Sequence, residues 1–473
     1  MQRALLLSLV AVSYILFAGG PRWTLIPLLV LAAATVLAAP RRTLSFPRET
    51  RSLDLALIAV IVAMVIQMTP LPGAIVGILS PNAADLRASL QFPAVSSGWA
   101  RLSVNPRASE VSLSVVILGV VTFWIARGAF GFGASTRQFC RALAVIGAAA
   151  ALSAVIFRVA APGLVNGVLA PESRSANPFG AFINRNHFAG WLLMIVGPVG
   201  GYLIAHLRIH PAYRQQFRLG LKQFLVSGAM VTAMAAATVL VVMLLTLSRS
   251  AAAGLGAAAI VAWRIGRRRA RLERSTRPIL LAVAAMGLVA AVLFVDIAGW
   301  TTRLEESLDT TGDRNRITIW RESAPVLRDF WVTGTGTGTY SDAMVKYQQS
   351  KVWIPSMGRW AHFNNAHSHY LQVAAEGGLL LLAPVLTALA LLVKFGRRAL
   401  RQDRGEMQWA RIGAAAGLVG IAVQSVWETS LVMPANAILC GAVAGLLLYQ
   451  RPQTLTRSPE PLAYTPDVPM TGR

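Results

Sequence analysis

The chain alternates long apolar stretches with short polar segments that are rich in arginine. Each apolar stretch has roughly the 20 residues that an α-helix needs to cross a hydrocarbon layer of about 30 Å. About twelve such stretches are centred on residues 4–18, 23–39, 53–68, 111–126, 142–161, 188–206, 224–247, 250–263, 279–298, 370–393, 411–427 and 434–449. The pattern predicts an all-α polytopic membrane protein with about twelve transmembrane helices.

The composition supports this prediction, since 55% of the 473 residues are hydrophobic and only 14% are charged. The first stretch has the length of a signal peptide, but no small-residue cleavage site precedes Pro21. We therefore expect an uncleaved first span. The two cysteines, Cys140 and Cys440, fall at or inside predicted spans, so we expect no disulfide framework.

The formal net charge of +24 suggests nucleic-acid binding, but the position of the charge argues against it. The basic residues gather in alternate loops, at 41–51, 127–141, 208–222, 264–277 and 394–411. Arginine-rich loops stay on the cytoplasmic side, so both termini are predicted to be cytoplasmic. Anionic membrane lipid, and no nucleic acid, is the partner that this basicity indicates.

The predicted spans divide the chain into four parts. Residues 1–300 hold spans one to nine, residues 301–366 form a long extracytoplasmic loop, residues 367–449 hold spans ten to twelve, and residues 450–473 form a disordered cytoplasmic tail. Residues 312–330 of the loop have helical spacing, with Ile317, Trp320, Ala324 and Leu327 predicted on one face. A loop of this length and mixed charge can fold over a membrane site.

Polar residues that could carry chemistry gather on the predicted extracytoplasmic side. Glu376 lies where the tenth span begins, and an ionisable group there costs about 2.5–3.5 kcal/mol on insertion scales unless it has a polar partner or cavity. The neighbouring motifs are 184–188 (NRNHF), 248–250 (SRS), 316–320 (RITIW), 366–370 (AHSHY) and 427–430 (WETS). Residues without a shared role would scatter over both sides, so a single site is predicted.

These residues resemble the O-antigen ligase and O-antigen polymerase superfamily of bacterial membrane glycosyltransferases. The resemblance covers about residues 175 to 440. It rests on 177–180 (NPFG), 184–190 (NRNHFAG), 247–250 (LSRS), Arg316 with Trp320, 334–338 (GTGTG), 366–367 (AH), 376–377 (EG) and 434–437 (PANA). One departure is that the family usually has His-Asn where this chain has His367-Ser368-His369.

The resemblance implies a GT-C-like, metal-independent, inverting transferase without cofactor, whose donor is an undecaprenyl-diphosphate-linked glycan. It implies that Arg249 and Arg316 contact the diphosphate and that His367 acts near the acceptor hydroxyl. Arginine stays charged and can hold phosphate oxygens bidentately, and histidine has a pKa suited to accepting a proton near pH 7. His369 and Glu376 are the other catalytic candidates, and the candidates for substrate binding are Arg185, Asn186, His187, Arg321, Tyr370 and Glu428.

The choice of base depends on where the tenth helix begins. If it already includes residue 366, then His369, Gln372 and Glu376 share one stripe and His367 points elsewhere. If residues 366–369 are loop, no such constraint applies. We favour His367, with His369 as the second candidate and a structural role for both as the third.

Two other patterns receive little weight. His362, His367 and His369 do not have zinc-ligand spacing, because positions i and i+2 cannot share a helix face and no Cys or Asp accompanies them. The glycines at 334, 336 and 338 lack the strand and helix of a nucleotide fingerprint. We interpret them as a flexible loop that passes close to the substrate.

The acceptor stays open. The candidates are a second glycan, as in a polymerase for lipopolysaccharide or exopolysaccharide, a lipid A core sugar, as in a ligase, and a protein hydroxyl. A polysaccharide or anionic-solute transporter is the alternative from another class, although its ionisable residues would lie near the bilayer midplane. A non-catalytic scaffold is the third hypothesis, and it predicts that His367→Ala is silent.

Overall fold

The structure is a computed structural model of the chain. It describes residues 1–40, 46–90, 98–130, 133–171, 176–209, 228–267, 311–351, 353–354, 359–360 and 362–449. The predicted ninth span (279–298), the first part of the long loop (301–310) and the tail (450–473) lie outside the described residues.

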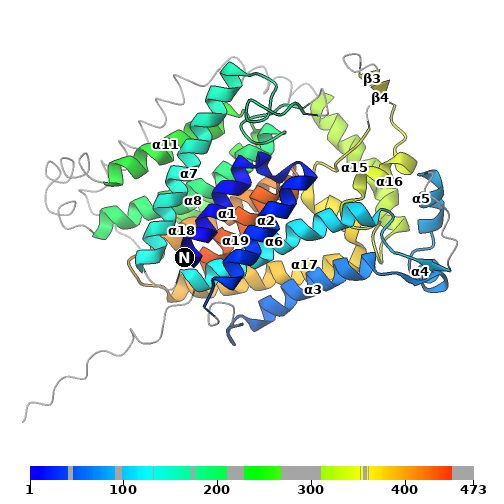
Figure 1. Cartoon of the computed structure of the whole chain (residues 1–473), viewed down its shortest axis with the longest axis horizontal. Coiled ribbons are helices and arrows are strands. Elements are labelled where there is room, and N and C mark those ends of the chain that lie inside the picture. The colour runs from blue at the N-terminus through cyan, green and yellow to red at the C-terminus, as the bar shows by residue number, and fades with distance from the viewer. Residues whose placement is uncertain are drawn as a thin grey trace, which may run out of the picture.

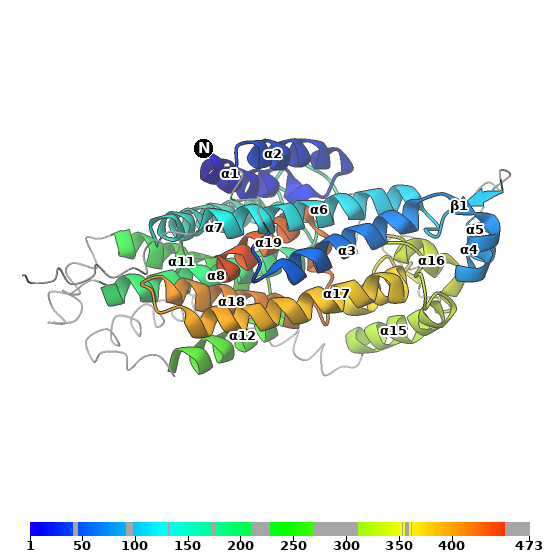
Figure 2. The ribbon, with the colours of Figure 1, turned by 90° about the horizontal axis from the view of Figure 1, so that it is seen from below.

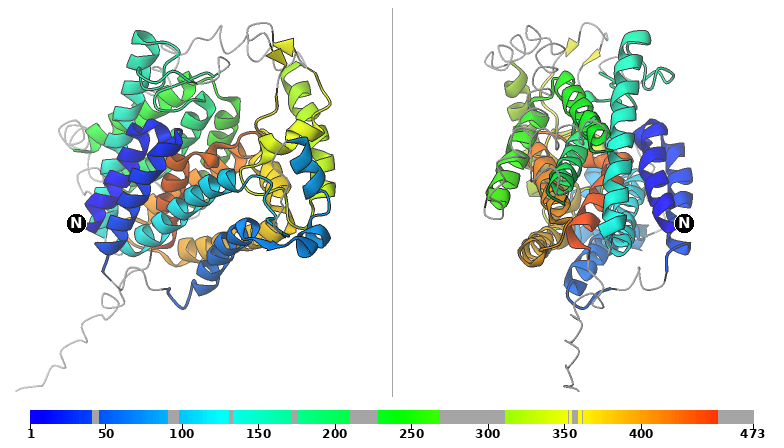
Figure 3. Two further views of the ribbon diagram at one scale, coloured as in Figure 1. Left: turned by 45° about the vertical axis from the view of Figure 1, so that its right-hand side comes forward. Right: turned by 90° about the vertical axis from the view of Figure 1, so that its left-hand side faces the viewer.

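The described chain is a bundle of helices that run along one axis (Figures 1 and 2). The helices of the bundle are α1 (Gln2–Ile15), α2 (Leu25–Leu37), α3 (Arg51–Met68), α6 (Pro106–Ala129), α7 (Gly133–Ala160), α8 (Arg185–Ile209), α11 (Gly228–Leu245), α12 (Arg249–Arg267), α17 (His369–Gln402), α18 (Gln408–Gln424) and α19 (Pro434–Leu448). The helices α1 and α2 form one edge of the bundle (Figure 3).

Every predicted span within the described residues coincides with one of these helices. Five of them, α3, α6, α7, α8 and α17, are long and apolar enough to cross a membrane, and α1, α2, α11 and α19 are shorter apolar helices. The chain is therefore an all-α protein of the polytopic membrane type, while the number of twelve spans stays a prediction.

Close helix packing depends on glycines at the centre of the bundle. The helix α18 packs against α8 and α12, and α6 packs against α19. A Cβ atom on Gly201 of α8 would overlap the Trp409 carbonyl oxygen, and one on Gly441 of α19 would overlap that of Gly119 in α6. Without a hydrophobic driving force between helices in lipid, such backbone contact supplies the van der Waals and polar attraction that holds them together.

Two neighbouring glycines of α8 give a matched test of this packing. Gly201→Ala is expected to destabilise the bundle by about 1–3 kcal/mol, because backbone atoms of α18 must move. Gly200 faces open space, so Gly200→Ala is expected to leave stability unchanged or slightly raised. Thermal unfolding of both variants in one detergent measures the difference. Equal melting temperatures would contradict this packing.

A smaller layer covers one end of the bundle. It contains α4 (Gly73–Leu79), α5 (Ala83–Ser89), α15 (Thr311–Asp329), α16 (Tyr340–Tyr347) and two short antiparallel two-stranded sheets, β1 (Leu71–Pro72) with β2 (Trp99–Ala100) and β3 (Trp353–Ile354) with β4 (Arg359–Trp360). The N-terminal part of α17 extends into this layer (Figure 2). Its own small core joins α15, α16 and α17 through Phe330, Tyr340 and Ala375.

The predicted helix at 312–330 is confirmed as α15, but its predicted apolar face is only partly right, because Trp320 and Leu327 pack against the small core while Ile317 and Ala324 are exposed. Ile317 is 52% exposed, whereas Ile319, Val326 and Phe330 are buried. The buried face also includes Ser323, whose hydroxyl lies 2.7 Å from the hydroxyl of Tyr340 and donates to its own helix. A serine in the buried stripe hides the apolar periodicity that the prediction relied on.

Candidate active site

Three long helices begin around the C-terminal end of α18. The first turn of α8 is held there by Gln424, whose side-chain amide donates to the Asn186 carbonyl at 2.8 Å. The helix α17 is held there by the His369 amide, which donates to the Ser425 carbonyl at 2.9 Å. Because helix N-termini carry unpaired N–H groups and positive partial charge, this end of the bundle favours anions.

The third of these helices, α12, runs antiparallel to α18. The two helices touch at Gly254 beside Gly420 and at Gly266 beside Trp409. Arg249 comes as many residues before Gly254 as Ser425 comes after Gly420. Because the helices are antiparallel, Arg249 and Ser425 lie at the same height along the bundle axis. The helices α8, α12 and α17 have no acidic residue in their first turns.

Arg249 opens α12 directly after a tight turn. Leu247 in this turn has φ 54°, a left-handed conformation that is unusual for leucine. A cation at a helix N-terminus is unfavourable by itself, because the helix dipole is positive there. Among the described residues, no hydrogen bond or ion pair involves the Arg249 guanidinium, and it is partly exposed. The turn therefore holds this charge where a bound anion would stabilise it.

Arg316 reaches the same place from α15. Its guanidinium lies 3.3 Å from Oε1 of Glu428, which follows α18. The same oxygen accepts a hydrogen bond from Asn186 at 2.7 Å. Burial raises the pKa of Glu428 to about 7, against the opposing effects of Arg316 and Asn186. Glu428 therefore links α15 to the first turn of α8. Arg185 also interacts electrostatically with Glu428.

His367 lies in the loop immediately before α17. Ser368 caps the helix by accepting a hydrogen bond from the Leu371 amide, so the helix begins at His369. His367 has φ 49°, a strained conformation of the kind that clusters at functional sites. Burial, followed by the nearby Arg316, lowers its pKa below the ordinary value of 6.5. His367 is therefore a neutral imidazole beside a cation at neutral pH.

Two more imidazoles lie close to His367. His187, in the first turn of α8, is near enough to interact electrostatically with both His367 and His369. The Nδ1 atom of His369 is buried and has no hydrogen-bond partner in the described part of the chain. In the same residues, no group of three or more His, Cys, Asp or Glu side chains has the arrangement to hold a metal ion.

Glu376 is occupied by backbone amides. Its carboxylate accepts hydrogen bonds from the Gly338 amide at 2.7 Å, the Tyr340 amide at 3.1 Å and the Gln372 side chain at 3.1 Å. The two backbone donors hold it against the segment that leads from α15 into α16, whereas Gln372 lies one turn earlier on α17 itself. A carboxylate within a predicted span requires a polar partner, and for Glu376 this partner is the loop backbone. We propose that Glu376 positions this loop.

The interpretation of residues 334–338 as a flexible loop was wrong. The three glycines all have positive φ, and Cβ atoms on Gly334 and Gly336 would overlap the Glu376 carbonyl and Ser103. The helix α17 breaks at Gly378, where φ is 53°, and residues 331–336 hydrogen bond to residues 375–380. The glycines are needed because the chain packs backbone against backbone at this point.

The contacts of Glu376 lead to a stability prediction. Glu376→Gln is expected to destabilise the protein by about 1–3 kcal/mol, because the new side-chain amide would face a backbone N–H that loses its acceptor. The measurement is thermal unfolding, together with glycan transfer per folded molecule. Transfer per folded molecule is expected to fall less than tenfold, and its abolition without loss of stability would show a direct catalytic role.

Two predicted substrate-binding residues lie at the margin of the cluster. Arg321 is on an exposed face of α15, roughly 140° around the helix from Arg316. The Tyr370 hydroxyl donates to the Ala422 carbonyl at 2.8 Å and so ties α17 to α18. The structure does not join either side chain to Arg316 or Glu428, and their contact with substrate stays a prediction.

The structure also identifies polar residues that the sequence reasoning missed. Gln67 of α3 donates to the carbonyls of Thr333 and Glu376 and accepts from the Thr337 amide. Asn436 of α19 donates to the carbonyls of His187 and Ser430. Both residues could have been found in the sequence, because each is an amide side chain inside an apolar stretch. Such a side chain needs hydrogen-bond partners from another helix.

Residues 234–386 match the family model described as O-antigen ligase. The matched range includes Arg249, Arg316, His367, His369 and Glu376. A comparison with curated proteins found no match. The match supports the O-antigen ligase superfamily for residues 234–386, which are about a third of the chain.

Proposed function

We propose that this protein is a membrane glycosyltransferase that moves an undecaprenyl-diphosphate-linked glycan onto an acceptor hydroxyl at the periplasmic face of a bacterial inner membrane. The family supports a glycosyltransferase-type role in surface polysaccharide biosynthesis. The observation that carries the proposal is the meeting of three helix N-termini with Arg185, Arg249 and Arg316 around the end of α18. This arrangement suits a diphosphate.

The arginines would stabilise the leaving group. In the proposed reaction, the bond between the anomeric carbon and the diphosphate oxygen breaks, and that oxygen gains negative charge. Arg249 and Arg316 would hold this charge by hydrogen bonds that strengthen as the bond breaks, so no metal ion is required. Glu428, which is 2% exposed, keeps the Arg316 guanidinium, which is 24% exposed, in position.

His367 would act as the general base. The acceptor hydroxyl attacks the anomeric carbon from the side opposite the diphosphate, which inverts its configuration, and its proton passes to the neutral imidazole. Burial and Arg316 keep His367 unprotonated, as a base at neutral pH must be. His187 lies beside it in the first turn of α8, and Asn186 of the same turn donates to Glu428; both would contact the donor.

The direct test is glycan transfer by the purified full chain from a lipid-linked donor, with and without a chelator. The proposal expects product formation that the chelator leaves unchanged. Mass analysis of the product identifies the acceptor as a second glycan, lipid A core or a protein hydroxyl. Movement of the glycan across the membrane without a new glycosidic bond would instead support a transporter.

The pKa shifts predict two steps on the acidic side of the pH profile. Glu428, with a pKa of about 7, loses its charge and its hold on Arg316 as the pH falls through that value. His367 is protonated only at lower pH, below 6.5. We therefore expect kcat/KM to fall first near pH 7 and again below pH 6.5. Glu428→Gln should remove the first step and keep the second. A single step in both proteins would contradict this assignment.

A further inference from the structure

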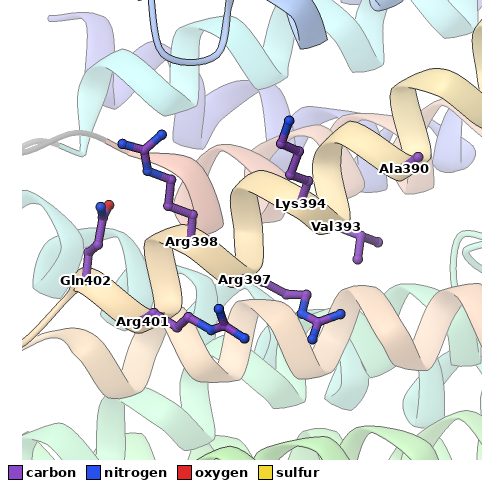
Figure 4. A pocket seen from close by; sticks show the side chains of 7 residues that line it. All are labelled: Ala390, Val393, Lys394, Arg397, Arg398, Arg401 and Gln402. Atoms are coloured by element: carbon purple, nitrogen blue, oxygen red, sulfur yellow. The ribbon is translucent and has the colours of Figure 1, made fainter.

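Long side chains form a hollow at the opposite end of α17 from the candidate active site (Figure 4). Its volume is about 540 Å³. The residues that line it all belong to the last turns of this helix: Ala390, Val393, Lys394, Arg397, Arg398, Arg401 and Gln402. The side chains of Lys394 and Arg398 extend to one side and those of Arg397 and Arg401 to the other (Figure 4).

The charge of this hollow is not balanced within the described chain. Its four cationic side chains are exposed, and none forms an ion pair with an acidic residue of the described part of the protein. Lys394 with Arg398, and Arg397 with Arg401, are like-charged pairs one helical turn apart, which destabilise an isolated helix. An anion from outside the chain would relieve this repulsion.

The hollow is amphipathic along the helix axis. Before the cations, α17 exposes Leu386 (52%), Leu389 (40%) and Val393 (50%), and α17 is one of the helices long and apolar enough to cross a membrane. An apolar surface therefore leads directly into a cationic one. A bilayer phospholipid has the same order of groups, acyl chains followed by a phosphate at the interface.

We propose that the end of α17 is a binding site for an anionic phospholipid. The acyl chains lie along Leu386, Leu389 and Val393, and the phosphate lies between the guanidinium groups of Arg397 and Arg401. Arginine pairs bind phosphate oxygens by charge-assisted hydrogen bonds. The orientation of a membrane protein requires only positive charge in its cytoplasmic loops and no such paired geometry. This inference is independent of the catalytic proposal.

The test is lipid retention by the full chain in nanodiscs that contain equal amounts of phosphatidylglycerol and phosphatidylcholine with the same acyl chains. Native mass spectrometry counts the lipids that stay bound after extraction into detergent. Wild type is expected to retain phosphatidylglycerol about tenfold better than phosphatidylcholine. The double variant Arg397→Gln/Arg401→Gln is expected to retain both lipids equally.

The control is Arg264→Gln/Arg404→Gln, which removes the same charge at the same end of the bundle but leaves the hollow intact. It is expected to keep the wild-type preference. Loss of preference in the control, or its persistence in the hollow variant, would overturn the proposal. Displacement of the lipid by millimolar inorganic phosphate would also overturn it, because the site would then bind free phosphate.

Discussion

Arg316→Ala is expected to lower the rate of glycan transfer by about 10²- to 10³-fold, with a much smaller change in donor binding. The loss has this size because a guanidinium that meets developing negative charge contributes mainly to the transition state. The measurement is steady-state transfer with lipid-linked donor, with kcat and KM determined separately. A change confined to KM would show that Arg316 binds the donor without assisting bond cleavage.

The variant needs controls because Arg316 also pairs with the buried Glu428. Arg316→Lys keeps the charge and loses the planar fork, so we expect intermediate activity with a nearly unchanged melting temperature. Arg328→Ala removes an arginine of the same helix whose side chain is 80% exposed, and activity is expected to stay within twofold of wild type. Equal losses in Arg316→Ala and Arg328→Ala would contradict the assignment.

His367→Ala is expected to reduce kcat by about 10²- to 10⁴-fold, the usual contribution of a positioned general base. His367→Asn is the better variant for folding, because asparagine tolerates the left-handed backbone found at this position. Both variants should lose the step below pH 6.5 in the pH profile. A silent His367→Ala would support a scaffold or a different base.

His369→Ala decides between the two candidate bases. We expect a smaller loss than in His367→Ala, because residue 369 begins a helix whose position is held by backbone hydrogen bonds. His362→Ala is the control, since this exposed histidine contacts Ser341 of α16. A larger loss in His369→Ala than in His367→Ala would reverse the assignment.

The helical architecture could be predicted because it depends on local information. An apolar run of sufficient length forms a helix in lipid whatever its neighbours, since the backbone must satisfy its own hydrogen bonds there. The motifs around Arg249, Arg316 and His367 were equally local, and the family match includes all three. The buried face of α15 was predicted only in part, because it includes Ser323, whose hydroxyl interacts with Tyr340 from another element.

The assembly of the site was decided by tertiary structure alone. Sequence placed Glu428, Asn186 and Arg316 on one side of the membrane, but their shared hydrogen bonds join three segments that are far apart in the chain. Glu376 was predicted to need a partner, and only the fold shows that the partner is the backbone of Gly338 and Tyr340. Residue type and local spacing determine charge, helices and candidate chemistry, whereas partners depend on packing between distant segments, which no local pattern records.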